Sequence, residues 1–312
     1  MRPEIRKIGE KELAAAVAFA NRQFGLDFYR LQPKLYRCNG SGASYGCYVE
    51  DSLAGMLSVY PCEYKGLRCL SAGTVCTAPE FRGCGIMSRL FGYLEEAVFP
   101  DYDLLTLAGK RERYEHFGFA KALCFPQYQL SRKGDDRDII ICPVEDQREE
   151  DVLAELCDRY GNGVTRRPGS VTYTLNGAGH TLYLLRRGEA VSYAACRTEQ
   201  FLIVEYGGSL PLMDAAAALA RLWQRETVFL LGRYNCLEPE LLRICDGYFL
   251  RSHGNIRINH PAKVAAALEG EESVGLSRSP LPLEETYSLL NWDSGRPPVL
   301  RIPSSLVYLD GI

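Results

Sequence analysis

Residues 75–90 read Val75-Cys76-Thr77-Ala78-Pro79-Glu80-Phe81-Arg82-Gly83-Cys84-Gly85-Ile86-Met87-Ser88-Arg89-Leu90. Their apolar start predicts a strand, and the apolar residues at every fourth position from Ile86 onward predict a helix. A loop that contains Gly83 and Gly85 joins the two. The first amides of a helix have no partner within it, and the aligned peptide dipoles make that end locally positive. The loop therefore predicts a phosphate-binding site, to which Arg82 adds a positive charge.

The spacing separates this loop from other phosphate-binding loops. A dinucleotide-binding fingerprint requires a third glycine where this sequence has Ser88, and a P-loop requires Gly-Lys-Ser/Thr, which the stretch lacks. The remaining pattern, Val-x-x-x-Pro-x-Phe-Arg-Gly-x-Gly-Ile-x-x-x-Leu, closely resembles the acetyl-CoA signature of the GNAT superfamily of N-acetyltransferases. A capped surface turn without a ligand is the alternative interpretation.

A second stretch, residues 111–119, resembles a further element of the same family, Tyr-x-x-x-Gly-Phe/Tyr, with Tyr114 as its tyrosine. The resemblance implies that Tyr114 is a general acid, because a phenol beside the thioester sulfur can donate a hydrogen bond or a proton to the departing thiolate. A thiol titrates near ~8.5 and a phenol near ~10, so complete transfer is uphill by ~2 kcal/mol and polarisation is the expected role. A packed tyrosine with a structural hydroxyl is the alternative. His116 could be proposed as a base, but it is two positions on from Tyr114 and is expected to face another side of the helix.

The resemblance also implies which residues bind acetyl-CoA. The backbone amides at the end of the strand would bind pantetheine and face the thioester carbonyl, and the loop and first helical turn would hold the pyrophosphate. Cys84 is expected to contribute its amide while its side chain points away. No metal is expected. The expected acetyl-CoA contacts are Val75, Cys76, Thr77, Arg82, Gly83, Cys84, Gly85, Ile86, Met87 and Ser88.

Length and composition predict a soluble protein with room for two domains. The chain has 312 residues, of which 46% are hydrophobic and 24% charged, and a net charge of −3. This charge argues against a nucleic-acid partner, and no apolar run approaches the ~20 residues that cross a bilayer. The 12 cysteines are scattered, with no Cys-x-x-Cys pair and no signal peptide, so reduced thiols and a cytoplasmic location are expected.

The order of predicted elements in the first half matches the same family. A helix over residues 10–24, three strands between residues 45 and 77, the helix from Ile86 to Val98 and a strand over residues 103–107 follow one another. This order resembles the GNAT fold, an α/β fold with a mixed sheet, in which two neighbouring strands splay and hold the pantetheine arm between them.

The second half repeats this order after a polar segment, residues 131–138, that has the composition of a linker. Its strand-to-helix turn, residues 207–211, lacks both the arginine and the Gly-x-Gly, so we expect no second acetyl-CoA site. Two GNAT-like units with one competent site resemble the tandem acetyltransferases of the enhanced-intracellular-survival (Eis) type. The expected division is an acetyltransferase domain over residues 1–133, a degenerate unit over residues 139–270 and a Pro-containing tail over residues 271–312, too short for the sterol-carrier-like third domain of that type.

The function implied is acetyl transfer from acetyl-CoA to a primary amine, by direct attack in a ternary complex. A lysine-like amine of pKa ~10.4 loses its proton at pH 7 at a cost of ~4.6 kcal/mol, so a base or a low-pKa amine is expected. Asp27, Glu50 and Glu63 are the candidates, with a solvated surface carboxylate as the alternative for each. The resemblance implies one more, the terminal carboxylate, which here would be that of Ile312. A non-catalytic acyl-CoA-binding or regulatory module is the alternative, and a nucleotide-dependent oxidoreductase is disfavoured. The sequence leaves open whether the acceptor is a small molecule or a peptide, and the oligomeric state.

Overall fold

The structure is a computed structural model, and it describes most of the chain up to residue 268. The Pro-containing tail at residues 271–312, which includes Ile312, lies outside the described residues, as does Arg111. None of the described helices is both long and apolar enough to span a lipid bilayer. The described ranges are 3–36, 42–107, 112–120, 124–161, 163–166, 168–233, 237–252 and 254–268.

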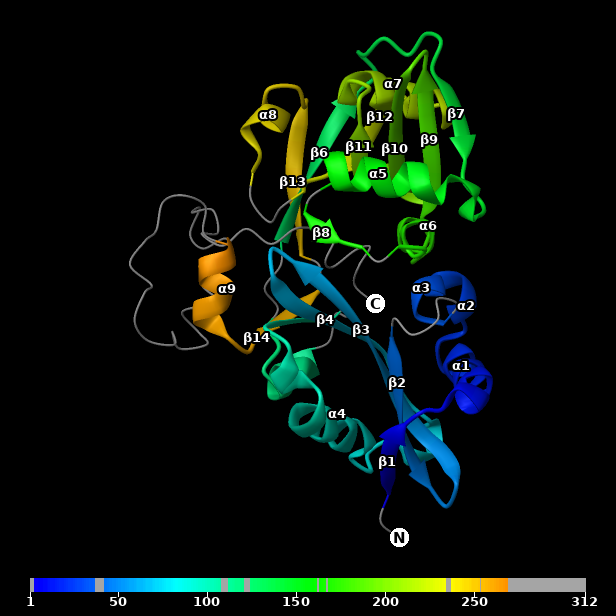
Figure 1. The fold of residues 1–312 in the computed structure, drawn as a ribbon, viewed down its shortest axis with the longest axis vertical. Coiled ribbons are helices and arrows are strands. Elements are labelled where there is room, and N and C mark those ends of the chain that lie inside the picture. Colours follow the sequence, from blue (N-terminus) through cyan, green and yellow to red (C-terminus); the bar gives the residue numbers. More distant parts are fainter. Residues whose placement is uncertain are drawn as a thin grey trace.

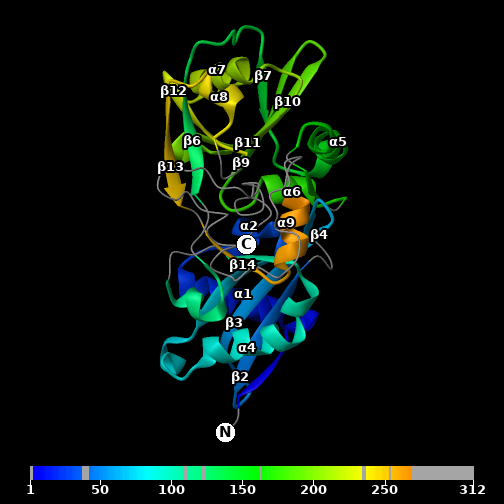
Figure 2. The same ribbon diagram turned by 90° about the vertical axis from the view of Figure 1, so that its left-hand side faces the viewer.

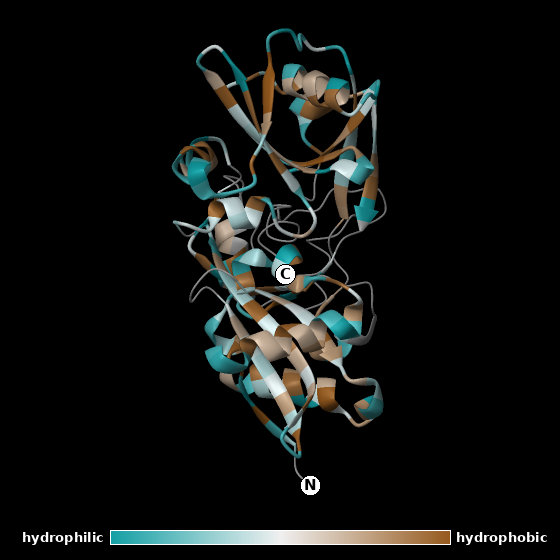
Figure 3. Cartoon of the chain, turned by 90° about the vertical axis from the view of Figure 1, so that its right-hand side faces the viewer, coloured by the Kyte–Doolittle hydropathy of each residue, from teal (hydrophilic) through white to brown (hydrophobic). Residues whose placement is uncertain are grey.

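Two mixed sheets lie end to end along the long axis of the molecule (Figures 1 and 2). The first sheet has the strand order β1-β2-β3-β4-β5-β14, and β8 also pairs with β3. Apolar residues recur along the strands of both sheets (Figure 3). The strands of the first sheet are β1 (Glu4–Lys7), β2 (Ala43–Val49), β3 (Ser52–Tyr64), β4 (Leu67–Thr77), β5 (Leu104–Leu107), β8 (Val164–Thr165) and β14 (Asn255–Ile258).

Helices cover both faces of this sheet. Met56 packs in one cluster with α1 (Glu10–Phe24), α2 (Phe28–Leu31) and α3 (Pro33–Tyr36), whereas its neighbour Leu57 packs with α4 (Ile86–Ala97) on the other face. Because side chains alternate along a strand, the two faces of β3 thereby receive different helices. Short 3-10 turns at Pro79–Phe81, Phe99–Asp101 and Glu112–Phe117 complete this part of the chain.

The second sheet has the strand order β13-β6-β12-β11-β10-β9-β7. Its β11 and β12 are parallel, as β4 and β5 are in the first sheet, and α7 connects them. The strands of this sheet are β6 (Cys124–Ser131), β7 (Ile140–Pro143), β9 (Thr181–Arg187), β10 (Ala190–Arg197), β11 (Leu202–Gly208), β12 (Thr227–Leu231) and β13 (Gly247–Ser252). The remaining helices are α5 (Glu150–Tyr160), α6 (Val171–Leu175), α7 (Leu212–Leu222), α8 (Pro239–Leu242) and α9 (Pro261–Leu268). Two further 3-10 turns lie at Gln147–Glu149 and Thr198–Gln200.

The sheets do not follow the expected division of the chain. β6 lies within the expected first domain but pairs with β12 and β13 of the second sheet, whereas β14 lies within the expected second unit but pairs with β5 of the first sheet. The expected linker at residues 131–138 therefore starts at the last residue of β6 and leads to β7 within the same sheet. The domain ranges 1–133 and 139–270 stay a prediction, and these two strands cut across them.

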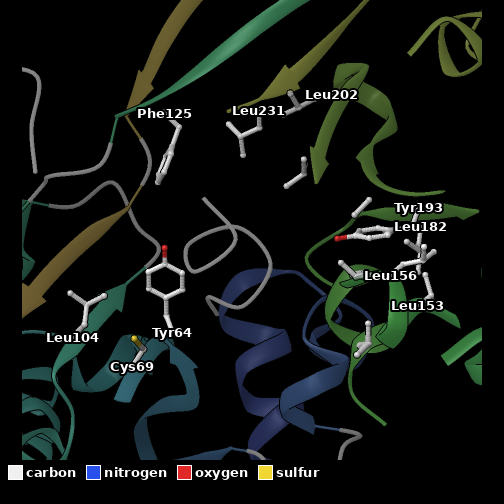
Figure 4. Packing of buried hydrophobic residues seen from close by; sticks show 14 of the residues in the cluster. Tyr64, Cys69, Leu104, Phe125, Leu153, Leu156, Leu182, Tyr193, Leu202 and Leu231 are labelled. Atoms are coloured by element: carbon white, nitrogen blue, oxygen red, sulfur yellow. The ribbon is translucent and has the colours of Figure 1, made fainter. Parts of the chain in front are cut away.

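An apolar cluster joins the two sheets. Tyr64, Cys69 and Leu104 of the first sheet belong to the same buried cluster as Tyr193 and Leu231 of the second (Figure 4). Each of these side chains is no more than 2% exposed. Burial of apolar surface stabilises a fold by about 25 cal/mol for each Å². Because one buried cluster contains residues of both sheets, the two sheets share a common core.

His180 lies immediately before β9 and lines a cavity of about 580 Å³ together with Arg30 of α2. It is 5% exposed, its Nε2 accepts a hydrogen bond of 3.1 Å from Arg197, and its Nδ1 has no partner among the described residues. Burial, reinforced by the positive charges of Arg197 and Lys34, lowers the pKa of His180 to about 3. The imidazole is therefore neutral in the folded protein over the whole physiological range.

This shift makes stability depend on pH. The folded pKa lies below the unfolded value of about 6.5, so the unfolded chain binds more protons between the two values, and stability falls as pH falls from about 6.5 toward 3. Between pH 7 and pH 5 we expect a loss of about 2 kcal/mol in urea unfolding, and we expect His180→Gln to remove it. His116→Gln, at an exposed histidine, is the control and should keep the loss. An equal loss in His180→Gln would contradict the assignment.

Candidate functional site

A cavity of about 600 Å³ lies where β4 ends and α4 begins. It brings together the expected acetyl-CoA contacts with one exception: the side chain of Cys84 is exposed and does not line it. Tyr114 lines the same cavity. Its lining consists of Gln23, Phe24, Val75, Cys76, Thr77, Phe81, Arg82, Gly83, Gly85, Ile86, Met87, Ser88 and Tyr114.

The two loop glycines occupy backbone conformations that other residues rarely adopt. Gly83 has φ of 84° and Gly85 has φ of 74°, and Gly85 is the N-cap residue of α4. A Cβ added to either would meet no atom within 4 Å. The left-handed conformation accounts for glycine here, and the open space above both residues lets a ligand approach the backbone.

The amides at the start of α4 are available to a ligand. Arg89 donates to the carbonyl of Gly85, which is the first bond of the helix, and within the described part of the chain no acceptor is found for the amides of Ile86, Met87 and Ser88. Together with the positive end of the helix dipole and the exposed Arg82, these amides form a site that suits an anionic group such as a diphosphate.

The strand β4 offers further amides along the cavity. Its pairing with β5 stops at Ala72, so among the described residues the part from Gly73 to Thr77 has no β5 partner. Ala78 donates to the carbonyl of Ala54 on the β3 side, and successive peptide groups of a strand point to opposite edges. The amides of Val75 and Thr77 therefore face away from β3, where a ligand carbonyl or amide can bind them.

Tyr114 is held by aromatic neighbours. It is 7% exposed, and its ring lies 6.0 Å from that of Phe91 on α4, while the amide of Phe119 donates to its carbonyl. His116, two residues on, is exposed and does not line the cavity. The 3-10 turn at Glu112–Phe117 thus presents the tyrosine and not the histidine to the site.

The candidate bases are not brought to this cavity. Asp27 is exposed and accepts the amide of Tyr29 as the N-cap of α2. Glu50 lies in the exposed turn between β2 and β3, and Glu63 lines a separate cavity of about 290 Å³. The base therefore stays unassigned among the described carboxylates.

Part of the sequence matches a known protein family. Residues 12–119 match the model of the acetyltransferase (GNAT) family. The match covers about a third of the chain, and a search of curated proteins by sequence gave no match.

Solved structures with the same fold extend over most of the chain. A probable N-acyltransferase from Enterococcus faecalis V583 has 16% identity and a TM-score of 0.66, and covers 88% of this chain and 77% of its own. Eis1 from Mycobacterium abscessus has 15% identity and a TM-score of 0.60, over the same shares of 88% and 77%. A GCN5-related N-acetyltransferase from Anabaena variabilis ATCC 29413 has 16% identity and a TM-score of 0.61, over 85% and 75%. These likenesses confirm the expected α/β fold, and the two mixed sheets are consistent with two tandem GNAT-like units.

The turn at residues 207–211 differs from the loop that contains Gly83 and Gly85. The amide of Leu210 donates to Ser192 Oγ at 3.0 Å, the amide of Ser209 donates to the carbonyl of Val191 at 3.0 Å, and the Tyr206 hydroxyl donates to the carbonyl of Leu210. The amides of this turn are thus already bonded within the protein, and the space beside it holds only about 30 Å³.

A buried ion pair fills the neighbouring part of β11. Arg166 donates two hydrogen bonds of 2.8 Å to Glu205, both side chains are 6% exposed or less, and the Tyr193 hydroxyl donates to the same carboxylate at 2.6 Å. The guanidinium opposes the effect of burial and keeps the pKa of Glu205 below its usual value.

Proposed function

We propose that this protein transfers an acetyl group from acetyl-CoA to a primary amine, with both substrates bound at the same time. One observation carries the proposal: a single cavity of about 600 Å³ is lined both by the amide-rich start of α4 and by the buried Tyr114. The first suits the diphosphate of CoA, and the second suits the sulfur of its thioester.

The reaction is attack of the amine nitrogen on the thioester carbonyl carbon. A C–N bond forms, the C–S bond breaks, and CoA leaves as its thiolate, while the nitrogen loses a proton to solvent or to a base. The amides of Val75 and Thr77 would stabilise the negative charge that develops on the carbonyl oxygen. The hydroxyl of Tyr114 would stabilise the thiolate by a hydrogen bond or by donating its proton.

A covalent acyl-cysteine route is less well supported than direct attack. Burial raises the pKa of the Cys76 thiol to about 12, so this thiol is protonated at neutral pH and is a poor nucleophile. The other cysteine of the loop, Cys84, does not line the cavity. Direct attack within a ternary complex needs neither thiol.

The test is release of free CoA thiol from acetyl-CoA in the presence of a panel of amines. We expect amine-dependent release and, at about 100 times the dissociation constant, stabilisation by acetyl-CoA of about 2.7 kcal/mol. A non-catalytic binding module would show the stabilisation without release. Absence of both at millimolar acetyl-CoA would contradict the proposal, including the assignment of the loop.

We also propose roles for the rest of the chain. The second unit would be a degenerate GNAT-like unit that supports the first and borders the acceptor site, as in a tandem acetyltransferase of the Eis type. A cytoplasmic location fits the described cysteines, all of which are free thiols. The acceptor would be a small molecule or a peptide with a primary amine.

One acetyl-CoA should bind per chain. The amides of the second turn are already bonded, and the space of about 30 Å³ beside it is too small for a cofactor arm. Isothermal titration calorimetry should therefore give a stoichiometry of one. A stoichiometry of two, or a second site that remains when binding at the loop of Gly83 and Gly85 is removed, would contradict this.

A further inference from the structure

Thr74 adopts a conformation that is unfavourable for its residue type. It lies in β4 immediately before Val75 and has φ of 50°, in the left-handed region, which β-branched residues rarely occupy. The register of β4 against β3 shifts at the same point, because Met56 pairs with Cys76 whereas Ser58 pairs with Gly73. Thr74 is therefore part of a bulge that sets the direction of the amides that follow it.

A chain of buried hydroxyl groups ends on this residue. Tyr36 donates to Thr74 Oγ1 at 3.0 Å and lies 3.1 Å from Ser58 Oγ, which is 2.8 Å from Ser44 Oγ. All four residues are 8% exposed or less. Since Tyr36 gives its single proton to Thr74, Ser58 must donate to Tyr36 and Ser44 to Ser58, so the bonds run in one direction toward the bulge.

The position of Tyr36 does not depend on its hydroxyl. It belongs to the short helix α3, and its ring makes edge-on contacts with Phe28 and Tyr29, at 6.4 and 6.1 Å between ring centroids. These ring contacts would hold α3 in place without the hydroxyl. Burial raises the pKa of Tyr36, so the hydroxyl stays protonated and remains a donor.

We propose that Tyr36 is a positioning residue for acetyl transfer: its hydroxyl holds the bulge at Thr74 so that the amides of Val75 and Thr77 face the thioester carbonyl. The inference rests on the proposed function and names what orients the proposed carbonyl site. Strained backbone persists where its surroundings hold it in place, and here the hydroxyl of Tyr36 supplies the hold.

The first test compares kcat with KM. Tyr36→Phe keeps the ring contacts and removes only the hydroxyl, and we expect kcat to fall about 10- to 100-fold with KM for acetyl-CoA nearly unchanged, because misplacement of a reacting group affects the transition state most. Ser44→Ala is the matched control: it removes a buried hydroxyl from the far end of the same chain and should leave kcat near the wild-type value. Wild-type kcat in Tyr36→Phe, or an equal loss in Ser44→Ala, would overturn the inference.

The second test is rescue at the bulge. Glycine adopts a positive φ without strain, so in a Thr74→Gly background the loss caused by Tyr36→Phe should shrink to about twofold or less. A loss of the same size in both backgrounds would show that Tyr36 acts elsewhere and would overturn the inference.

The third test needs no amine acceptor. The infrared carbonyl band of bound acetyl-CoA, labelled with ¹³C at the carbonyl, should shift to lower frequency in the wild type, and the shift should be reduced in Tyr36→Phe. An unchanged band in the variant would overturn the inference even where turnover supports the proposed function. Binding and a band shift without any amine-dependent turnover would instead contradict the proposed function and leave the role of Tyr36 in orienting the carbonyl supported.

Discussion

Gly85→Asp is expected to weaken acetyl-CoA binding by about 100-fold or more. Gly85 is the N-cap of α4 with φ of 74°, and open space lies where its side chain would be. The carboxylate would occupy the proposed diphosphate site, and like charges about 4 Å apart repel by about 4 kcal/mol at the effective dielectric constant of a protein surface. Isothermal titration calorimetry with acetyl-CoA measures the effect.

The control for this variant is Gly85→Asn. Asparagine has nearly the same shape, tolerates the left-handed conformation as aspartate does, and carries no charge. Both side chains meet the same conformational cost at a φ of 74°, so the melting temperatures of the two variants should be close to each other. If Gly85→Asn lost as much affinity as Gly85→Asp, steric exclusion and not charge would be responsible, and unchanged affinity in both would remove the loop from the binding site.

Tyr114→Phe is expected to lower kcat by about 10²- to 10⁴-fold with acetyl-CoA affinity nearly unchanged, the range for loss of one general acid. The substitution preserves the ring packing against Phe91 and removes only the hydroxyl. A structural hydroxyl would behave differently: its loss would leave kcat intact and lower stability by about 0.5–1.5 kcal/mol. Rate and melting temperature measured on the same variant separate the two.

Tyr93→Phe serves as the control for this measurement. Tyr93 packs against the same apolar cluster as Tyr114, but it does not line the cavity. We expect kcat of Tyr93→Phe to equal that of the wild type. Full activity with reduced stability in Tyr114→Phe would remove Tyr114 from the mechanism and leave the strand amides and amine positioning as the sources of rate.

Local features of the fold were predictable from the sequence. The strand at Leu67–Thr77 and the helix expected over Ile86 to Val98, which ends one residue earlier at Ala97, follow from apolar patterns within a few residues of each other. The loop between them follows from two glycines and an arginine next to a helix start. Because these residues follow one another in one short stretch, all of the expected contacts except Cys84 line one cavity.

Contacts between distant segments were not predictable. Phe24 is the last residue of α1, is 43% exposed and lines the cavity together with Gln23. Only the packing of α1 against the sheet brings these residues to the site, and no motif marks them. The hydroxyl contact between Tyr36 and Thr74 likewise joins residues 38 positions apart, and no spacing rule indicates it.

The return of β14 to the first sheet has a consequence for biosynthesis. Asn255 on β14 bonds to Leu107 on β5, 148 positions earlier in the chain. The side chains of β5 are all buried in the finished fold. During translation, β5 therefore lacks its neighbour β14 until the strands of the second sheet have been synthesised. Long-range pairing of this kind slows folding, and an unpaired apolar edge is prone to aggregate. The first sheet thus becomes complete last, although most of its strands are synthesised first.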